Sequence, residues 1–138
     1  MVAPSRRIRV LLVEDNPMLL RQVSEVLPDD VEIVGTLESG AELNAAIEAS
    51  APDVIVLDIT LPGDSGLTLA ARLTAQGCTA RIVFLTMHLD PDYVTRALAV
   101  GACGYVVKLR LAFDLEPALR SAVEGRRFVS PVPELSGD

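Results

Sequence analysis

The stretch VLLVEDNP at residues 10–17 decides the fold, because a short apolar run stops there at two acids and the start of a helix. Four apolar residues bounded by polar ones are typical of a strand buried on both faces of a parallel sheet. Asn16 followed by Pro17 is a favoured pairing for the N-cap and the first position of a helix. The stretch therefore predicts a strand, an acidic turn and a helix in succession.

The same unit recurs along the 138 residues. Further short strands are predicted at 31–34, 54–57, 82–85 and 104–107, and helical segments at 17–27, 40–49, 67–75, 91–101 and 115–123. Asp114 is expected to cap the last helix. Strands that alternate with helices form parallel sheets with right-handed crossovers. We predict an α/β fold, a doubly wound (βα)5 flavodoxin-like sandwich with the parallel strand order 2-1-3-4-5.

Composition restricts the kind of protein. Half of the residues are apolar and 4% are aromatic, so aliphatic side chains must fill the core of one domain. The formal net charge of −7 argues against nucleic-acid binding by this segment, since such binding neutralises phosphates with Lys and Arg. No apolar run approaches the ~20 residues of a membrane span, so we expect a cytoplasmic protein with no membrane partner. Cys78 and Cys103 lack metal or redox spacing and are interpreted as reduced thiols.

Polar residues stand at the ends of four of the predicted strands. Glu14 and Asp15 follow the first strand, Asp58 the third, Thr86 the fourth and Lys108 the fifth. Ligands of open α/β sheets bind at the carboxyl ends of the strands. We therefore expect these five side chains to converge on one site.

The acids of this group predict a metal site. Neighbouring carboxylates repel one another unless a cation lies among them. Mg²⁺ prefers hard oxygen ligands, usually one or two carboxylates together with water and phosphate oxygens. We predict a Mg²⁺ site with Asp15 and Asp58 as direct ligands and with Glu14 binding directly or through water. The backbone carbonyl of Thr60 is expected to complete the set.

Asp58 is also the best candidate nucleophile. A carboxylate attacks phosphorus to form an aspartyl phosphate, and phosphoryl transfer depends mainly on positioning and charge neutralisation. The Lys108 ammonium supplies a point charge for one phosphoryl oxygen, and the Thr86 hydroxyl supplies a hydrogen bond for another. Four strand ends that all carry such groups favour a phosphoryl site.

Five separated motifs carry a resemblance to a known family. They are Val-Glu-Asp-Asn-Pro at 13–17, Val-Leu-Asp at 56–58, Leu-Pro-Gly at 61–63 with Gly66, Leu-Thr at 85–86 and Gly-Tyr-Val-Val-Lys at 104–108. Over about residues 8–128 the chain resembles a response-regulator receiver domain of two-component signalling. The resemblance implies that a histidine kinase phosphorylates Asp58 and that Mg²⁺ is held by Glu14, Asp15 and Asp58.

The resemblance also implies how the signal leaves the site. Thr86 and Tyr105 form a switch pair, in which Thr86 moves toward the phosphoryl group and Tyr105 turns inward. The face made by the fourth helix, the fifth strand and the fifth helix then changes shape, and a homodimer through this face is a further expectation. Only self-phosphorylation and self-dephosphorylation are expected, so the chain is not classed as an enzyme.

The stretch LTMHLDPDYV at 85–94 is most similar to the LuxR-type DNA-binding subfamily, whose members carry a helix-turn-helix domain after the receiver. We therefore expect a receiver domain at 1–128 and, at 129–138, a tail or the start of a linker. Transcription is the expected output, with DNA bound only through a C-terminal domain that this sequence lacks. His88 is interpreted as a loop residue beside the site. Leu109 departs from the proline that often follows the lysine in this family.

Three other interpretations stay open. A stand-alone or degenerate receiver would act only as a binding module. A Mg²⁺-dependent phosphatase of the aspartyl-phosphate type would use the same nucleophile, but that class wants a second acid two residues later, where Thr60 stands. Flavin binding in the same fold is the third and weakest interpretation.

Overall fold

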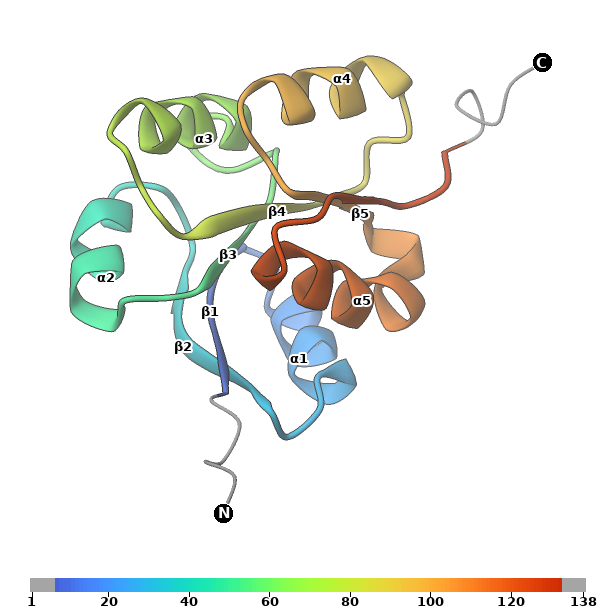
Figure 1. Cartoon of the computed structure of the whole chain (residues 1–138), viewed down its shortest axis with the longest axis horizontal. Coiled ribbons are helices and arrows are strands. Elements are labelled where there is room, and N and C mark those ends of the chain that lie inside the picture. Colours follow the sequence, from blue (N-terminus) through green and yellow to red (C-terminus); the bar gives the residue numbers. More distant parts are fainter. Residues whose placement is uncertain (1–6, 133–138) are drawn as a thin grey trace.

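A parallel sheet of six strands forms the centre of the computed structural model, which describes residues 7–132 (Figure 1). Its order is β2-β1-β3-β4-β5-β6, and this confirms the predicted order of the first five strands. The strands are β1 (Ile8–Val13), β2 (Val31–Leu37), β3 (Val54–Leu57), β4 (Arg81–Thr86), β5 (Gly104–Val107) and β6 (Phe128–Val129).

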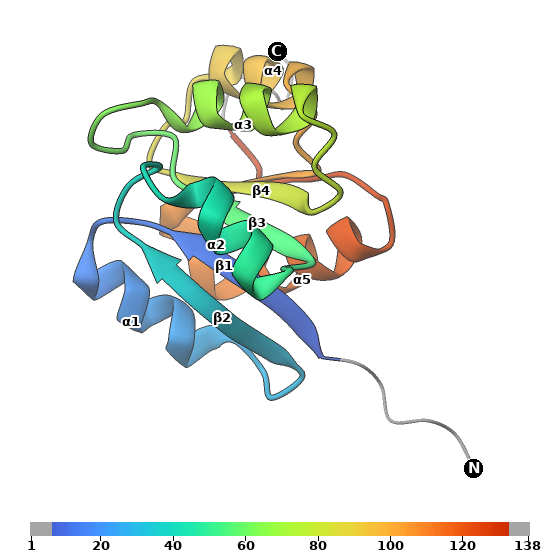
Figure 2. The ribbon, with the colours of Figure 1, turned by 90° about the vertical axis from the view of Figure 1, so that its left-hand side faces the viewer.

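Five α-helices cover the two faces of this sheet (Figures 1 and 2). Helices α2, α3 and α4 lie on one face, and α1 and α5 lie on the other. Their bounds are α1 (Pro17–Val26), α2 (Leu43–Ser50), α3 (Gly66–Ala75), α4 (Pro91–Ala99) and α5 (Leu111–Val123), with a short 3-10 turn η1 (Lys108–Arg110) before α5. The predicted doubly wound sandwich is therefore confirmed.

Alternate residues of the central strands fill two separate apolar cores. In β1, Leu11 and Val13 pack toward α2 and α3, whereas Val10 and Leu12 pack toward α1 and α5. All four side chains are buried. A strand enclosed on both faces has no water-facing side, and this explains why the strands read as uninterrupted apolar runs.

Among the described residues, side chains of Asn16, Ser65 and Asp90 cap the helices α1, α3 and α4. The Asn16 side chain accepts hydrogen bonds from the N–H groups of Met18 and Leu19, at 2.9 and 3.4 Å. Asp90 accepts one from the N–H of Asp92 at 2.9 Å. Each cap satisfies amides that the first turn of a helix leaves without a partner, so the polar turn fixes where the helix starts.

The predicted start of the last helix is wrong. Helix α5 begins at Leu111, directly after η1, and Asp114 lies inside it and does not cap it. The Asp114 carboxylate is buried and accepts hydrogen bonds from Arg110 Nε and from Ser130 Oγ, both at 2.7 Å. Ser130 lies sixteen residues after Asp114, so the sequence of the helix by itself does not reveal this partner.

The chain after α5 also differs from the expected tail. Val129, which was expected to begin it, pairs with Tyr105 in β6, and Ser130 N–H donates to the Tyr105 carbonyl at 2.8 Å. Ser130 Oγ accepts from the N–H of Val107 at 3.1 Å, and Val132 is buried in the core under α4. Residues 129–132 therefore belong to the folded unit. The rest of the predicted tail, 133–138, lies outside the described residues, as do residues 1–6.

Replacing Ser130 by alanine tests this closing segment. Ser130→Ala leaves the Val107 N–H without its acceptor and Asp114 without one donor in a buried place, and we expect unfolding to become easier by about 1–3 kcal/mol. Urea unfolding measures the change. Ser24→Ala is the control, because Ser24 is an exposed helical residue that bonds only to its own helix. Equal effects of the two substitutions would contradict the assigned role of Ser130.

Candidate functional site

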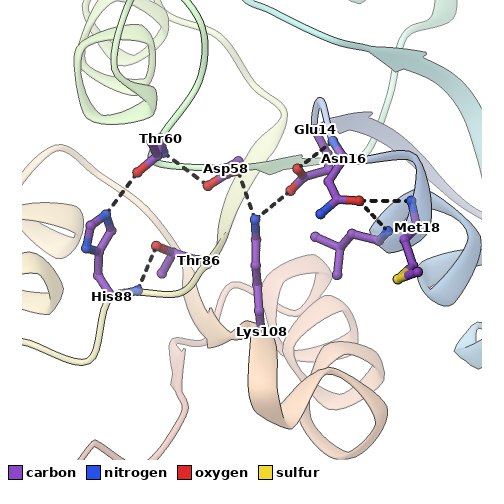
Figure 3. Close-up of polar contacts among 9 residues, drawn as sticks. Glu14, Asn16, Met18, Asp58, Thr60, Thr86, His88 and Lys108 are labelled. Carbon is purple, nitrogen blue, oxygen red and sulfur yellow. Dashed lines mark hydrogen bonds and ion pairs between the residues drawn. The ribbon is translucent and has the colours of Figure 1, made fainter.

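The carboxyl ends of four neighbouring strands bring the predicted polar residues together. Glu14 and Asp15 follow β1, Asp58 follows β3, Thr86 ends β4 and Lys108 follows β5. Figure 3 shows the Lys108 side chain reaching between the carboxylates of Asp58 and Glu14. The convergence expected from the sequence is therefore what the fold produces.

Lys108 joins the two buried acids. Its Nζ lies 3.0 Å from Asp58 Oδ2 and 3.0 Å from Glu14 Oε1. Burial by itself lowers the pKa of the Lys108 ammonium, but the bonds to Asp58 and Glu14 outweigh it and the pKa is raised. Lys108 therefore stays cationic, and Leu109 after it does not draw it away, since the Leu109 side chain points to solvent and is 74% exposed.

Glu14 is the most deeply enclosed acid of the site. Burial raises the pKa of its carboxyl group, and the nearby Asp58 charge adds to this rise. Lys108 and the N–H of Asn16, which donates to Oε2 at 3.0 Å, oppose the rise, and the net shift is upward. Within residues 7–132, the buried Oε1 receives the Lys108 ion pair but no well-directed hydrogen bond. Such an oxygen favours a further positive partner.

Three carboxylates form a cluster that could hold a metal ion. One oxygen from each of Glu14, Asp15 and Asp58 lies within 4.8 Å of the other two, and Asp15 is exposed while its neighbours are buried. Hard oxygens of this kind suit a small divalent cation that keeps some of its water. The Glu14 oxygen that lacks a directed donor fits the same conclusion. The predicted carbonyl ligand at Thr60 stays a prediction.

The loop after β3 holds Asp58 by its backbone. The N–H of Thr60 donates to Asp58 Oδ1 at 3.0 Å. Gly66, the first residue of α3, packs so closely on this loop that a Cβ there would collide with the carbonyl oxygen of Asp58. Only glycine permits this approach of helix and loop. The glycine of the sequence motif thus serves the geometry of Asp58.

Thr86 and Tyr105 are both buried, and each forms a hydrogen bond with the backbone of His88. Thr86 Oγ1 accepts a hydrogen bond from the His88 N–H at 3.1 Å, and the Tyr105 hydroxyl donates to the His88 carbonyl at 2.8 Å. Burial raises the pKa of Tyr105 to about 12, with Tyr93 and Asp90 adding to the rise. The Tyr105 ring lies inside the core, and its expected inward turn upon phosphorylation stays a prediction.

The sequence did not single out His88 as a connecting residue. Its Nε2 lies 2.9 Å from Thr60 Oγ1, and its ring stacks on Tyr93 with 4.0 Å between ring centroids. One signal was available, since His88 stands two residues after Thr86 and Thr60 stands two residues after Asp58. Residues just beyond the ends of two adjacent strands face each other across the site.

Comparison with known proteins agrees with this geometry. Residues 10–120 match the family model of the response regulator receiver domain. Over 126 residues the chain is 37% identical to the uncharacterised transcriptional regulatory protein YvfU and 35% identical to the transcriptional regulatory protein DesR, both of Bacillus subtilis. These alignments cover 90% of this chain but 63% of YvfU and 62% of DesR. The chain thus spans less than two thirds of the length of these curated relatives.

A solved structure extends the comparison to three dimensions. The LuxR-family two-component response regulator of Aurantimonas sp. SI85-9A1 superposes with a TM-score of 0.82 at 30% identity, and the match covers 91% of each chain. The fold and the matched residues together define a signalling domain of two-component systems. The chain belongs to the response-regulator receiver family, and its relatives are response regulators of the LuxR type. Such proteins act in signalling and are not enzymes of the ordinary kind.

None of the helices within residues 7–132 has both the length and the apolar character that crossing a bilayer requires.

The buried phenol of Tyr105 predicts how stability responds to alkaline pH. An unfolded tyrosine has a pKa of about 10, and burial raises that of Tyr105 to about 12. A raised pKa in the folded state means that its stabilisation is complete below about pH 10 and is lost as the pH rises toward 12. The loss amounts to about 2–3 kcal/mol, because one pKa unit corresponds to about 1.4 kcal/mol.

The chain has two tyrosines, so Tyr93→Phe leaves Tyr105 as the single phenol to be followed by ultraviolet absorbance. We expect its ionisation well above pH 10 in the folded variant, somewhat below the value of about 12 in the wild type because the contribution of Tyr93 is lost, and near pH 10 in urea. Circular dichroism recorded in parallel reports whether the protein is still folded. Ionisation near pH 10 with the fold intact would show that the hydroxyl is not buried.

Proposed function

We propose that Asp58 accepts a phosphoryl group from a histidine kinase in a Mg²⁺-dependent reaction. The observation that carries this proposal is the setting of Asp58: a buried carboxylate at the carboxyl end of the sheet, 3.0 Å from the Lys108 ammonium and within an acidic cluster. Family membership supports it, because the five matched motifs include this acid and this lysine.

The transfer forms one bond and breaks one. An oxygen of the Asp58 carboxylate bonds to phosphorus while the bond from phosphorus to the donor's imidazole nitrogen breaks, and the electron pair of that bond stays on the nitrogen. The Lys108 ammonium, 3.0 Å from Asp58 Oδ2, would neutralise a phosphoryl oxygen of the acyl phosphate. Mg²⁺ held by Glu14, Asp15 and Asp58 would supply the remaining charge neutralisation.

Thr86 adds a hydrogen bond to this arrangement. A threonine hydroxyl both accepts and donates, and Thr86 Oγ1 already accepts from the His88 N–H. Its own hydrogen can therefore be directed at a phosphoryl oxygen on Asp58. We propose that this contact changes the face formed by α4, β5 and α5. The segment between Thr86 and α4 would carry this change, because the backbone of His88 in that segment bonds to both Thr86 and Tyr105.

The phosphatase alternative receives no support from the position after Asp58. That class of enzyme wants a second acid where Thr60 stands, and the Thr60 hydroxyl is engaged with His88 at 2.9 Å. A degenerate receiver used only for binding is disfavoured by the acids and lysine that meet in the site. We propose that the chemistry of the chain is limited to gaining and losing its own phosphoryl group.

Transcription is the proposed output. YvfU and DesR are named as transcriptional regulatory proteins, and each is longer than the part that aligns with this chain. We propose that a C-terminal helix-turn-helix domain outside this sequence contacts DNA, and that the protein acts in the cytoplasm beside its kinase. The net charge of −7 supports leaving DNA contact to another domain.

Phosphorylation itself has a direct test. Incubation with acetyl phosphate and Mg²⁺ is expected to raise the intact mass by one phosphoryl group, and Asp58→Asn is expected to abolish the gain because it removes the nucleophile. Chelation of Mg²⁺ is expected to prevent the gain as well. Asp64→Asn is the matched control, since Asp64 is an exposed acid near the same loop that pairs with Arg72.

Two results would contradict the assignment: no mass gain in the wild-type protein, or an equal gain in Asp58→Asn. Hydrolysis of an added phosphomonoester over many turnovers would favour the phosphatase alternative.

A homodimer through the α4-β5-α5 face is part of the same proposal. The edge of β5 is paired with β6, so the contact must come from the helices and the residues beside them. Leu89, which precedes α4 and is 41% exposed, offers apolar area there. We expect Leu89→Glu to weaken phosphorylation-dependent dimerisation in sedimentation experiments by about tenfold or more, since a charge in a contact core is costly.

Met18→Glu is the control for this experiment, because Met18 is an exposed apolar residue on α1, away from that face. Equal weakening by both substitutions, or dimers unaffected by Leu89→Glu, would exclude the proposed face.

A further inference from the structure

His88, a partly exposed loop residue, contacts four other residues. Its backbone N–H donates to Thr86 and its carbonyl accepts from Tyr105. Its side chain contacts two other residues: Nε2 lies 2.9 Å from Thr60 Oγ1, and the ring stacks on Tyr93 at 4.0 Å with 12° between the planes. The backbone contacts join the switch pair, whereas the side-chain contacts join a different pair of residues.

The side-chain contacts of His88 are the middle of a longer path. At one end, the N–H of Thr60 donates to Asp58 Oδ1 at 3.0 Å. At the other end, Tyr93 belongs to the first turn of α4, and the Arg96 guanidinium lies 5.5 Å from its ring centroid. Figure 3 shows Thr60 and His88 facing one another beside Thr86 and Asp58. Asp58 and α4 are thus linked through side chains that do not include the Tyr105 ring.

We propose that His88 is a positioning residue that couples the Asp58 loop to α4 through its imidazole ring. The trigger rests on the proposed phosphorylation of Asp58. A phosphoryl group brings charge and acceptor oxygens next to the Thr60 amide. A displacement of Thr60 moves the His88 ring through their hydrogen bond, and the ring then displaces Tyr93, on which it stacks. Coupling of this kind travels through contiguous contacts with two arrangements.

The contacts among Thr60, His88 and Tyr93 lie at the surface, so breaking them tests the coupling without a large change in the stability of the fold. Thr60 is exposed, and His88 and Tyr93 are partly exposed. Hydrogen bonds and ring contacts that water can reach contribute little net stability. The Thr60–His88 bond also forms in either imidazole tautomer, because the hydroxyl can donate to Nε2 or accept from it. Because these contacts lie at the surface, they can be broken one at a time without disturbing the packed core.

Amide NMR spectra of α4 test the proposal. Wild-type protein loaded with acetyl phosphate and Mg²⁺ is expected to shift the amides of residues 92–99, with loading measured by intact mass. In Tyr93→Leu, which removes the stacked ring, loading is expected to be unchanged while the α4 shifts fall to less than about half. Tyr93→Phe keeps the ring and is expected to behave as wild type. His88→Gln keeps a hydrogen-bonding group but loses the stack, and is expected to resemble Tyr93→Leu.

A second measurement needs no phosphoryl group. Thr60→Val breaks the bond to His88 in the unloaded protein and is expected to shift the amides around Tyr93 and Arg96. The same substitution placed in Tyr93→Leu is expected to leave the Arg96 amide unshifted. This measurement distinguishes the two proposals. If the wild-type protein gains no phosphoryl group but Thr60→Val still shifts the α4 amides, the phosphorylation proposal fails and the coupling stands.

The coupling is overturned if Tyr93→Leu keeps the full α4 shifts at equal loading, or if Thr60→Val leaves the α4 amides unchanged. A purely structural role for the stack predicts that Tyr93→Leu lowers the urea midpoint while the loaded α4 shifts persist, and that result would overturn it too.

Discussion

The site depends on the ion pairs that the partly buried Lys108 ammonium makes with two buried carboxylates. Two carboxylates, those of Asp58 and Glu14, lie out of water within 3.0 Å of it, and buried charges are tolerated only when they are paired. The order of the strands restricts how the ion pair between Lys108 and Asp58 can form, because β4 lies between β3 and β5. Neighbouring strands are about 4.8 Å apart, so the cation must come from a long side chain that passes the end of β4. Lysine has that length, and Thr86 at the end of β4 is small enough to leave room.

The sequence predicted those features that local or periodic signals encode. Buried strands appear as apolar runs, and the cap at Asn16 appears as a turn residue before proline. The site could be predicted as well, because the carboxyl ends of parallel strands must meet whatever the loops do. Two parts were wrong, the start of α5 and the loose tail expected from Val129, and both depend on contacts between residues that are far apart in the sequence. From the sequence, Asp114 resembles an N-cap. In the structure its carboxylate instead accepts a hydrogen bond from Ser130, sixteen residues later. His88 was passed over for the same reason, since its partners lie on other elements.

Tyr105 and Thr86 are held together by one stretch of backbone. The Tyr105 ring lies inside the core and its hydroxyl donates to the His88 carbonyl. A ligand can only shift an equilibrium between states that the chain already visits. If Asp58 is phosphorylated as proposed, a hydrogen bond from Thr86 would favour one of those states. The His88 backbone accepts from Tyr105 and donates to Thr86, and it therefore fixes both residues relative to each other.

The same tyrosine connects the site to the end of the folded chain. The Tyr105 side chain reaches toward the site, while its carbonyl accepts the N–H of Ser130 in the segment that follows α5. An open strand edge is prone to pair with another chain, and here β6 occupies the edge of β5. A shift of β5 would therefore also move β6 and Ser130, which are hydrogen-bonded to it. If the α4-β5-α5 face changes as proposed, the backbone bonds between β5 and β6 would therefore carry the change as far as Ser130.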